Sequence, residues 1–337
     1  MPSSELKQQI AAMPKLEMHI HLEGTISQSR VKAMAEALGE ELPRPEDELF
    51  ETGDLSLFLA TLDWVCSLVR TPEIAAQIAA DFVEYCKEQN IVYTEVIVNP
   101  THWKGMHFSE LFPALDECFE KAAAEGGPDI RLLPSILRQQ TREEALELVV
   151  WIGAAQKHGK GKRIVGLSID GNEAASGPTG EKFAPAYKLA AELGLGLTAH
   201  AGESSGADGV TEALDYLGAQ RLDHGIRAAE KPEVVQRLVD SGTTLNICLS
   251  SNCTLLYKDI SEHPIFALME AGVPFTLNTD DPVVLKTNLI DELSWAADKL
   301  DLDVPMLLSL QQNAVNSAFC SESRKAELNG ILSAYLN

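Results

Sequence analysis

The stretch Leu195-Gly196-Leu197-Thr198-Ala199-His200-Ala201-Gly202-Glu203 indicates the fold of this chain. Its apolar run is typical of a buried strand, and polar residues with reactive side chains follow directly at the carboxyl end of that run. In parallel sheets, functional groups gather on the loops that follow the carboxyl ends of the strands. A strand that ends in His200 and Glu203 therefore predicts a parallel α/β architecture.

Seven further strand-like runs lie along the chain, and longer stretches with helical periodicity separate them. The eight predicted strands span residues 16–21, 92–98, 130–137, 164–170, 195–201, 221–224, 244–250 and 273–279. Helices are predicted at residues 57–69, 74–88, 182–193, 210–217, 232–241 and 264–271. This alternation predicts a closed (β/α)8 TIM barrel, and a doubly wound parallel sheet is the alternative.

The 337 residues are expected to form one barrel domain, because no internal repeat and no Pro/Gly/Ser-rich linker divides them. A helical insertion resembling a lid is expected after the first strand, at about residues 25–90, and the acidic segment 39–53 within it is expected to be a loop or lid. Phe58, Leu62 and Trp64 either cover a ligand or belong to an ordinary helix core. Residues 305–337 are expected to form a helical tail outside the barrel.

Composition excludes several classes of protein. The 27 basic and 50 acidic residues give a net charge of −23, and no run of Lys and Arg exists that would neutralise nucleic-acid phosphates. No apolar run approaches the roughly 18 to 20 residues of a membrane span, and residues 1–13 lack the apolar core of a signal peptide. We therefore expect a cytoplasmic protein with no nucleic-acid or membrane partner. The six scattered cysteines form no CxxC pair, so neither disulfides nor a cysteine metal site is expected.

Four residues at predicted strand ends suit a metal ion. His19 and His21 are two positions apart on the first strand, so both side chains point to the same face. His200 closes the fifth strand and Asp280 follows the eighth, and a barrel brings these ends to one mouth. Three imidazoles and a carboxylate suit one zinc ion per chain. The alternative is that the histidines are packed in the core and Asp280 caps a helix before Pro282.

Further polar residues near these positions suit proton transfer. Glu203, three residues after His200, is placed to donate and accept a proton, or else caps the following helix. His224 ends the sixth strand, where it either orients a water molecule or is a buried structural histidine. Asp281 is expected to reach substrate while Asp280 binds metal. The remaining histidines match no such position and are expected to be ordinary surface or packing residues; they are His102, His107, His158 and His263.

Five motifs resemble the adenosine deaminase family of the amidohydrolase superfamily, over most of the chain and in the same order. They are Met13-Pro14-Lys15-Leu16-Glu17-Met18-His19-Ile20-His21-Leu22-Glu23-Gly24, His200-Ala201-Gly202-Glu203, His224-Gly225, Ser250-Ser251-Asn252 and Asn278-Thr279-Asp280-Asp281-Pro282. The resemblance implies zinc on His19, His21, His200 and Asp280 and attack of hydroxide at C6 of a 6-aminopurine. It also implies that Glu203 protonates N1 while His224 and Asp280 assist catalysis, and that the substrate contacts are His21, Glu23, Gly171 through its backbone toward N3, and Asp281 toward N7.

The resemblance points to more than one substrate. Adenosine deaminases usually have Asp where this chain has Glu23, at a position that approaches the ribose, and Glu there resembles adenine deaminases. Asp170-Gly171-Asn172-Glu173 and Thr279 look more like adenosine-type enzymes. We expect conversion of adenosine and 2′-deoxyadenosine to inosine and ammonia; the alternatives are adenine, an N6-substituted adenine or aminodeoxyfutalosine. A different metallohydrolase on the same barrel and a catalytically silent binding protein remain more distant readings, and the sequence leaves the oligomeric state open.

Overall fold

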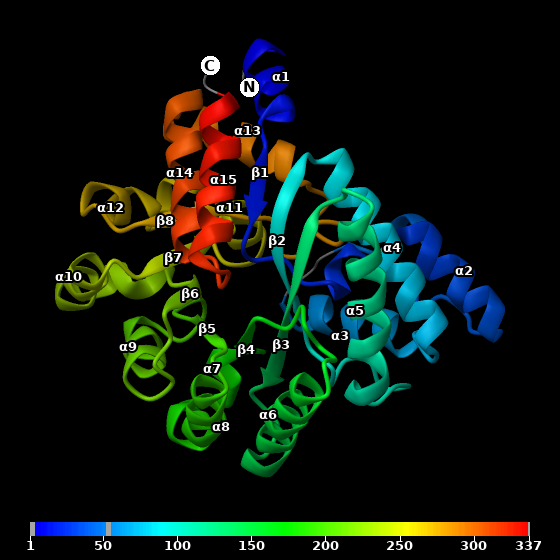
Figure 1. Cartoon of the computed structure of the whole chain (residues 1–337). Coiled ribbons are helices and arrows are strands. Elements are labelled where there is room, and N and C mark those ends of the chain that lie inside the picture. Colours follow the sequence, from blue (N-terminus) through cyan, green and yellow to red (C-terminus); the bar gives the residue numbers. More distant parts are fainter. Residues whose placement is uncertain (1–3, 52–54, 336–337) are drawn as a thin grey trace.

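The computed structural model describes residues 4–51 and 55–335, and eight parallel strands among them form a ring at the centre of the protein (Figure 1). The strands are β1 (Lys15–Glu17), β2 (Ile91–Val98), β3 (Asp129–Leu137), β4 (Gly166–Asp170), β5 (Gly196–Ala201), β6 (Arg221–His224), β7 (Thr244–Ile247) and β8 (Phe275–Leu277). Each strand pairs with the next along the chain. Beyond β8 and β1 the ring closes, because the backbone N–H of His21 donates to Asp280 at 2.8 Å and that of Asp280 donates to His19 at 3.2 Å. The predicted (β/α)8 TIM barrel is confirmed.

Helices cover the outside of the strands (Figure 1). They are α1 (Ser4–Ala12), α2 (Gln28–Leu38), α3 (Leu55–Ser67), α4 (Pro72–Glu88), α5 (Phe108–Ala124), α6 (Arg142–Lys157), α7 (Glu173–Ser176), α8 (Gly180–Glu192), α9 (Ala207–Asp215), α10 (Pro232–Ser241), α11 (Leu249–Leu255), α12 (Ile265–Glu270), α13 (Leu289–Leu300), α14 (Val304–Ser317) and α15 (Glu322–Tyr335). Local sequence sets several ends: Thr141 and Glu144 form a capping box at the start of α6, and α10 ends at Gly242 with φ of 66°. Within the described chain, no helix is both long and apolar enough to cross a membrane.

Three predicted strands extend further at their carboxyl ends than the observed strands β1, β7 and β8. The ladder of β1 stops at Glu17 because the side-chain oxygen of Asn278 accepts the backbone N–H groups of Met18 and His19, at 2.8 and 3.2 Å. The predicted strand 244–250 ends at Ile247, since α11 begins two residues later, and β8 ends at Leu277 rather than at residue 279. The chain therefore leaves the ladder before it presents its polar residues.

The segment between β1 and β2 contains α2, α3 and α4, which lie together on one side of the barrel (Figure 1). Leu62 on α3 is buried and lines the cavity described below, and Trp64 packs partly buried against the core. The side chain of Phe58 lies outside the described part of the structure, as do residues 52–54. That this segment acts as a lid stays a prediction.

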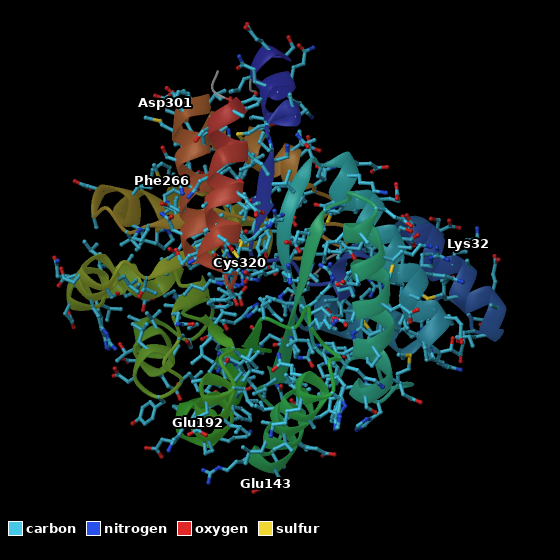
Figure 2. The ribbon with its side chains drawn as sticks, in the orientation of Figure 1. Lys32, Glu143, Glu192, Phe266, Asp301 and Cys320 are labelled. Carbon is cyan, nitrogen blue, oxygen red and sulfur yellow. The ribbon has the colours of Figure 1, made fainter. Side chains whose placement is uncertain are left out.

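The tail after residue 303 forms α14 and α15, and the last turn of α15 lies close to α1 (Figure 1). The hydroxyl of Tyr335 donates to the carbonyl of Gln9 at 2.7 Å. The turn between the two helices reaches under the barrel, where the Phe319 ring packs 4.0 Å from the guanidinium carbon of Arg221. Figure 2 shows the next residue, Cys320, near the middle of the molecule, whereas Lys32 and Phe266 lie at its periphery.

The amino end of the barrel is thus filled. Arg221 and Glu95 are fully buried and form an ion pair at 2.7 Å, and the Phe319 ring lies against β5 so closely that a Cβ on Gly196 would be 2.1 Å from it. A buried pair of this kind needs both partners, because an isolated buried charge is costly. The opposite, carboxyl end is left as the place for a site.

Candidate active site

A cavity of about 430 Å³ opens at the carboxyl end of the barrel. Its lining includes most of the residues that the sequence predicts for the site, which are His21, Glu23, Gly171, His200, Glu203, His224, Asp280 and Asp281. His19 lies beneath them with no exposed surface. Residues from five strand ends, those of β1, β4, β5, β6 and β8, therefore meet, as the barrel prediction requires.

The four predicted metal ligands converge at the base of this cavity. The Nε2 atoms of His21 and His200 are 3.0 Å apart, and Oδ1 of Asp280 lies 3.1 Å from Nε2 of His19 and 3.5 Å from Nε2 of His21. One ligand atom from each of the four residues lies within 4.8 Å of all the others. Tetrahedral zinc with bonds of about 2.0 to 2.1 Å places its ligand atoms roughly 3.3 Å apart. The donor set and its spacing fit zinc.

Contacts on the far side of two imidazoles orient them for this role. The Nδ1 atom of His200 lies 3.1 Å from the carbonyl of Ile169, and that of His19 lies 3.3 Å from the carbonyl of Asn246. Because only an N–H can pair with a carbonyl, Nδ1 carries the proton and Nε2 is free to bind metal. Burial also lowers the pKa of His200 and of His21, which favours the neutral form that a metal needs.

Asp280 is held ionised and in an unusual backbone conformation. Burial alone would raise its pKa, yet the imidazoles of His19, His224 and His21 hold that pKa well below its usual range. Ser251, at the start of α11, donates its hydroxyl to Oδ2 at 2.6 Å. The φ angles of Asp280 and His224 are 66° and 64°, and such strain in residues other than glycine is characteristic of functional sites.

Glu203 follows β5 and lies at the edge of the same cluster. Its Oε1 atom is 3.6 Å from Nε2 of His224. Ligand atoms of Glu203, His224 and Asp280 all lie within 4.8 Å of one another. Burial raises the pKa of Glu203, with Asp280 and Glu173 adding to the shift. The carboxyl group is therefore able to hold a proton at a pH where an exposed glutamate has lost it.

A chain of hydrogen bonds fixes His224. The backbone N–H of Ile265 donates to Nδ1 of His263 at 3.0 Å, so Nε2 of His263 carries the proton and donates to Asn252 at 3.1 Å. The amide nitrogen of Asn252 lies 3.2 Å from Nδ1 of His224 and donates to it. His224 consequently carries its proton on Nε2, which faces the cavity. His263, to which the sequence assigned no function, supports the site indirectly, because it orients Asn252 and Asn252 orients His224.

Glu23 is locked in place by two donors. Its Oε1 atom accepts the backbone N–H of Asn99 and the indole N–H of Trp103, both at 2.7 Å. Burial raises the pKa of Glu23 to about 7. The other oxygen, Oε2, is buried and has no hydrogen-bond partner among the described residues. One oxygen is thus structural, and the second is available to a ligand.

Asp281 lies beside Glu23. The backbone of Gly24 packs against it so tightly that a Cβ on Gly24 would lie 2.1 Å from Oδ1 of Asp281. That Oδ1 atom is also buried without a hydrogen-bond partner in the described structure. Burial, followed by the charges of Asp280 and Glu23, raises the pKa of Asp281 well above its usual range. Asp281 is therefore protonated where Asp280 is ionised.

Gly171 follows β4 and borders the cavity with a left-handed φ of 96°. Glycine adopts this conformation without the strain that a Cβ would bring. Residues that the sequence did not single out also contribute: Trp103 and Asn99 hold Glu23, and His102 lines the cavity while Nδ1 pairs with Asp63 at 2.7 Å. Asn99 directly follows the predicted strand 92–98, so the signal that found the others could have found it, whereas His102 and Trp103 lie further along the turn.

Known proteins resemble this chain over nearly its whole length. The sequence model of the adenosine deaminase family matches residues 14–335. The adenine deaminase of Rhodospirillum rubrum is 32% identical over 330 residues, covering 96% of this chain and 97% of the relative. The aminodeoxyfutalosine deaminase of Acidothermus cellulolyticus is 33% identical and covers 96% and 92%. Among solved structures, an amidohydrolase of Burkholderia ambifaria with bound zinc has a TM-score of 0.88, with 25% identity over 100% of this chain and 96% of the other.

Proposed function

Because the chain belongs to the adenosine deaminase family, we propose that it removes the amino group of adenine by hydrolysis and releases hypoxanthine and ammonia. The protein is a zinc-dependent hydrolytic deaminase that acts on a 6-aminopurine. The proposal concerns which purine it uses and which residues act on it.

The observation that carries the proposal is the pair of unpartnered oxygens on Glu23 and Asp281. In the imidazole ring of a purine, N7 and N9 are separated by a single carbon, so two neighbouring carboxyl groups match these two nitrogens. Protonated Asp281 donates to N7, which is an acceptor in adenine, and ionised Glu23 accepts the hydrogen on N9. A nucleoside carries a sugar on N9 and has no hydrogen there, so this second contact selects the free base.

Zinc would be held by His19, His21, His200 and Asp280, whose spacing fits its coordination. When bound, this ion supplies a water nucleophile that ionises near neutral pH. The four ligands lie at the base of the cavity, next to Glu203 and His224.

Glu203 performs the proton transfers. As oxygen adds to C6, the aromatic character of the ring is lost, and Glu203 donates its proton to N1 to take up the electron pair. The carbon becomes tetrahedral, and the ionised Glu203 takes the proton of the newly attached hydroxyl and passes it to the amino nitrogen. The C6–N bond then breaks to release ammonia and leave the 6-oxo product, and the next water molecule returns a proton to Glu203. The N–H of His224 stabilises the charge on the attacking oxygen, and the backbone of Gly171 faces N3.

A second candidate is a 6-aminopurine that carries a substituent on N9. Beyond Glu23 the cavity is also lined by polar groups, which are Thr101, His102, Lys104, Gln139 and Asn172. These would suit a sugar or a larger substituent, and one relative is named for aminodeoxyfutalosine. Adenosine, the substrate expected from the sequence, falls in this class. Its use stays a prediction, because the relative from Rhodospirillum rubrum is named for adenine and not for adenosine.

The test compares adenine with 9-methyladenine, which differs only by a small methyl group in place of the N9 hydrogen. Adenosine, N6-methyladenine and aminodeoxyfutalosine complete the panel, and ammonia release reports turnover. We expect kcat/KM for adenine to exceed that for 9-methyladenine by about 10 to 100-fold, the equivalent of one hydrogen bond to a charged group. Equal or faster turnover of 9-methyladenine or adenosine would refute the free-base proposal and favour the second candidate.

A further inference from the structure

Glu173, the first residue of α7, makes an unusually complete set of contacts with the loop that carries Glu203. Its Oε2 atom accepts the backbone N–H groups of Glu203 and Ser204 at 2.8 and 3.1 Å. Its Oε1 atom accepts the backbone N–H of Gly202 at 3.0 Å and the hydroxyl of Ser205 at 2.7 Å. A single carboxylate thus binds four consecutive residues, 202–205, of the loop that follows β5.

Burial of this carboxylate requires compensation, because a buried charge is costly unless it is paired and hydrogen-bonded. Glu173 is 3% exposed, and a guanidinium nitrogen of Arg138 lies 3.7 Å from its Oε1. Arg138 is itself buried at the end of β3, where it donates to the carbonyl of His200 and to the hydroxyl of Thr179 at 2.7 Å. The Arg138–Glu173 pair therefore ties the ends of β3, β4 and β5 together.

The position of Glu173 in the chain connects it to the other side of the substrate. Gly171, whose backbone faces N3 of the purine in the proposed complex, lies two residues before Glu173 in the turn after β4. Glu203 faces N1, and N1 and N3 are separated by one carbon of the six-membered ring. Glu173 thus cross-links the two loops that contact these neighbouring nitrogens, and no described contact of its carboxyl group reaches the cavity itself.

We propose that Glu173 is a positioning residue for deamination, which holds the loop of residues 202–205 so that the Glu203 carboxyl reaches N1. This inference rests on the proposed function, since it takes Glu203 to be the proton donor. Misplacement of a catalytic group by about 1 Å costs on the order of 10²-fold in rate, so a loop with fewer anchors should turn over slowly.

The test uses Glu173→Gln, in which one amide oxygen and one N–H₂ group replace two acceptor oxygens, so that only two of the four donors keep an acceptor. We expect kcat to fall about 10 to 100-fold, with zinc content unchanged and KM within about threefold of the parent. Glu181→Gln is the matched control: Glu181 is an exposed glutamate on neighbouring α8, and its substitution should leave kcat unchanged.

The decisive measurement is a double-mutant cycle with Glu203→Gln. A residue that acts through Glu203 has little left to do when Glu203 cannot donate a proton, so Glu173→Gln should lower kcat by less than about threefold in that background. Ser205→Ala removes one of the four contacts more gently and should lower kcat about two- to tenfold in the parent, with the same loss of effect beside Glu203→Gln. If either substitution lowers kcat equally in both backgrounds, the positioning role is wrong and Glu173 serves only the stability of the fold.

The parent enzyme separates this inference from the function on which it rests. A parent that deaminates none of the purines in the panel refutes the proposed function, and the positioning role falls with it. A parent that is active, with effects of Glu173 and Glu203 that multiply, refutes the positioning role alone. Should Glu173→Gln fail to fold, Ser205→Ala supplies the cycle by itself.

Discussion

Substitution of Glu23 by Asp provides the sharpest test of how the pocket reads the purine. The change removes one methylene and draws the carboxylate back by about 1.5 Å. The contacts of Oε1 with Asn99 and Trp103, both 2.7 Å in the parent, would then exceed hydrogen-bond range. The carboxylate would also withdraw from the N9 position and leave space there.

The expected magnitude follows from these contacts. An N9–H bond to a carboxylate contributes about 1.5 to 3 kcal/mol, so kcat/KM for adenine should fall roughly 10 to 100-fold. Adenosine, which has no such bond to lose and gains space for its sugar, should be used as well as before or better. The fully buried N–H groups of Asn99 and Trp103 would each lose a partner, at a cost of about 1 to 3 kcal/mol of stability.

The assay is the ratio of kcat/KM for adenine over adenosine, measured by ammonia release in the parent and in Glu23→Asp. Trp103→Phe is the control, because it removes one donor to Glu23 but leaves the carboxylate at full length and still held by Asn99. Its ratio should stay closer to that of the parent. A ratio that Glu23→Asp leaves within about threefold of the parent would show that Glu23 does not contact the N9 side of the substrate.

Four further outcomes are expected. Elemental analysis should find one zinc per chain, and removal of that zinc by a chelator should abolish turnover reversibly; two metals per chain would contradict the four-ligand site. Glu203→Gln should retain zinc while kcat falls about 10² to 10⁴-fold, and a kcat within about threefold of the parent would exclude Glu203 as proton donor. With adenine, kcat/KM should rise with pH as Glu23 ionises near its pKa of about 7; with 9-methyladenine this rise should be absent. Burial raises the pKa of Glu292 to about 7, so the folded state holds this proton more tightly than the unfolded chain does. The free energy of unfolding should therefore fall as pH rises between about 4.5 and 7, by at most about 1.4 kcal/mol per pH unit. Urea unfolding of the parent and of Glu292→Gln at both ends of this range measures the difference, and equal slopes in the two proteins would contradict it.

The sequence predicted the parts of the site that depend on barrel topology. His200 and His224 each end a predicted strand, and a closed ring brings such ends together whatever the details of the loops. His19 and His21 lie at the mouth although β1 stops at Glu17, because isolated bridges to the segments after β8 and along β2 continue past the strand. Topology therefore tolerated an error of several residues in the strand boundary.

Contacts between loops were not predictable in this way. Trp103 and Glu23 are 80 positions apart, and their hydrogen bond depends on how the turn after β2 folds over the barrel. Likewise, His263 acts on His224 through Asn252, and no spacing in the sequence identifies such a chain. Residues that support the site through a partner are found only when the partner's position is known.

The pair Asp280 and Asp281 shows why residue identity alone does not assign a chemical role. Both are buried, and burial by itself raises the pKa of either carboxyl group. Three imidazoles surround Asp280 and keep it ionised, whereas the nearest charges around Asp281 are other carboxylates, which keep it protonated. An ionised carboxylate suits a cation, and a protonated one suits a ring nitrogen with a lone pair. In the proposed function Asp280 binds metal and Asp281 contacts the purine, and the groups around each carboxyl account for this difference.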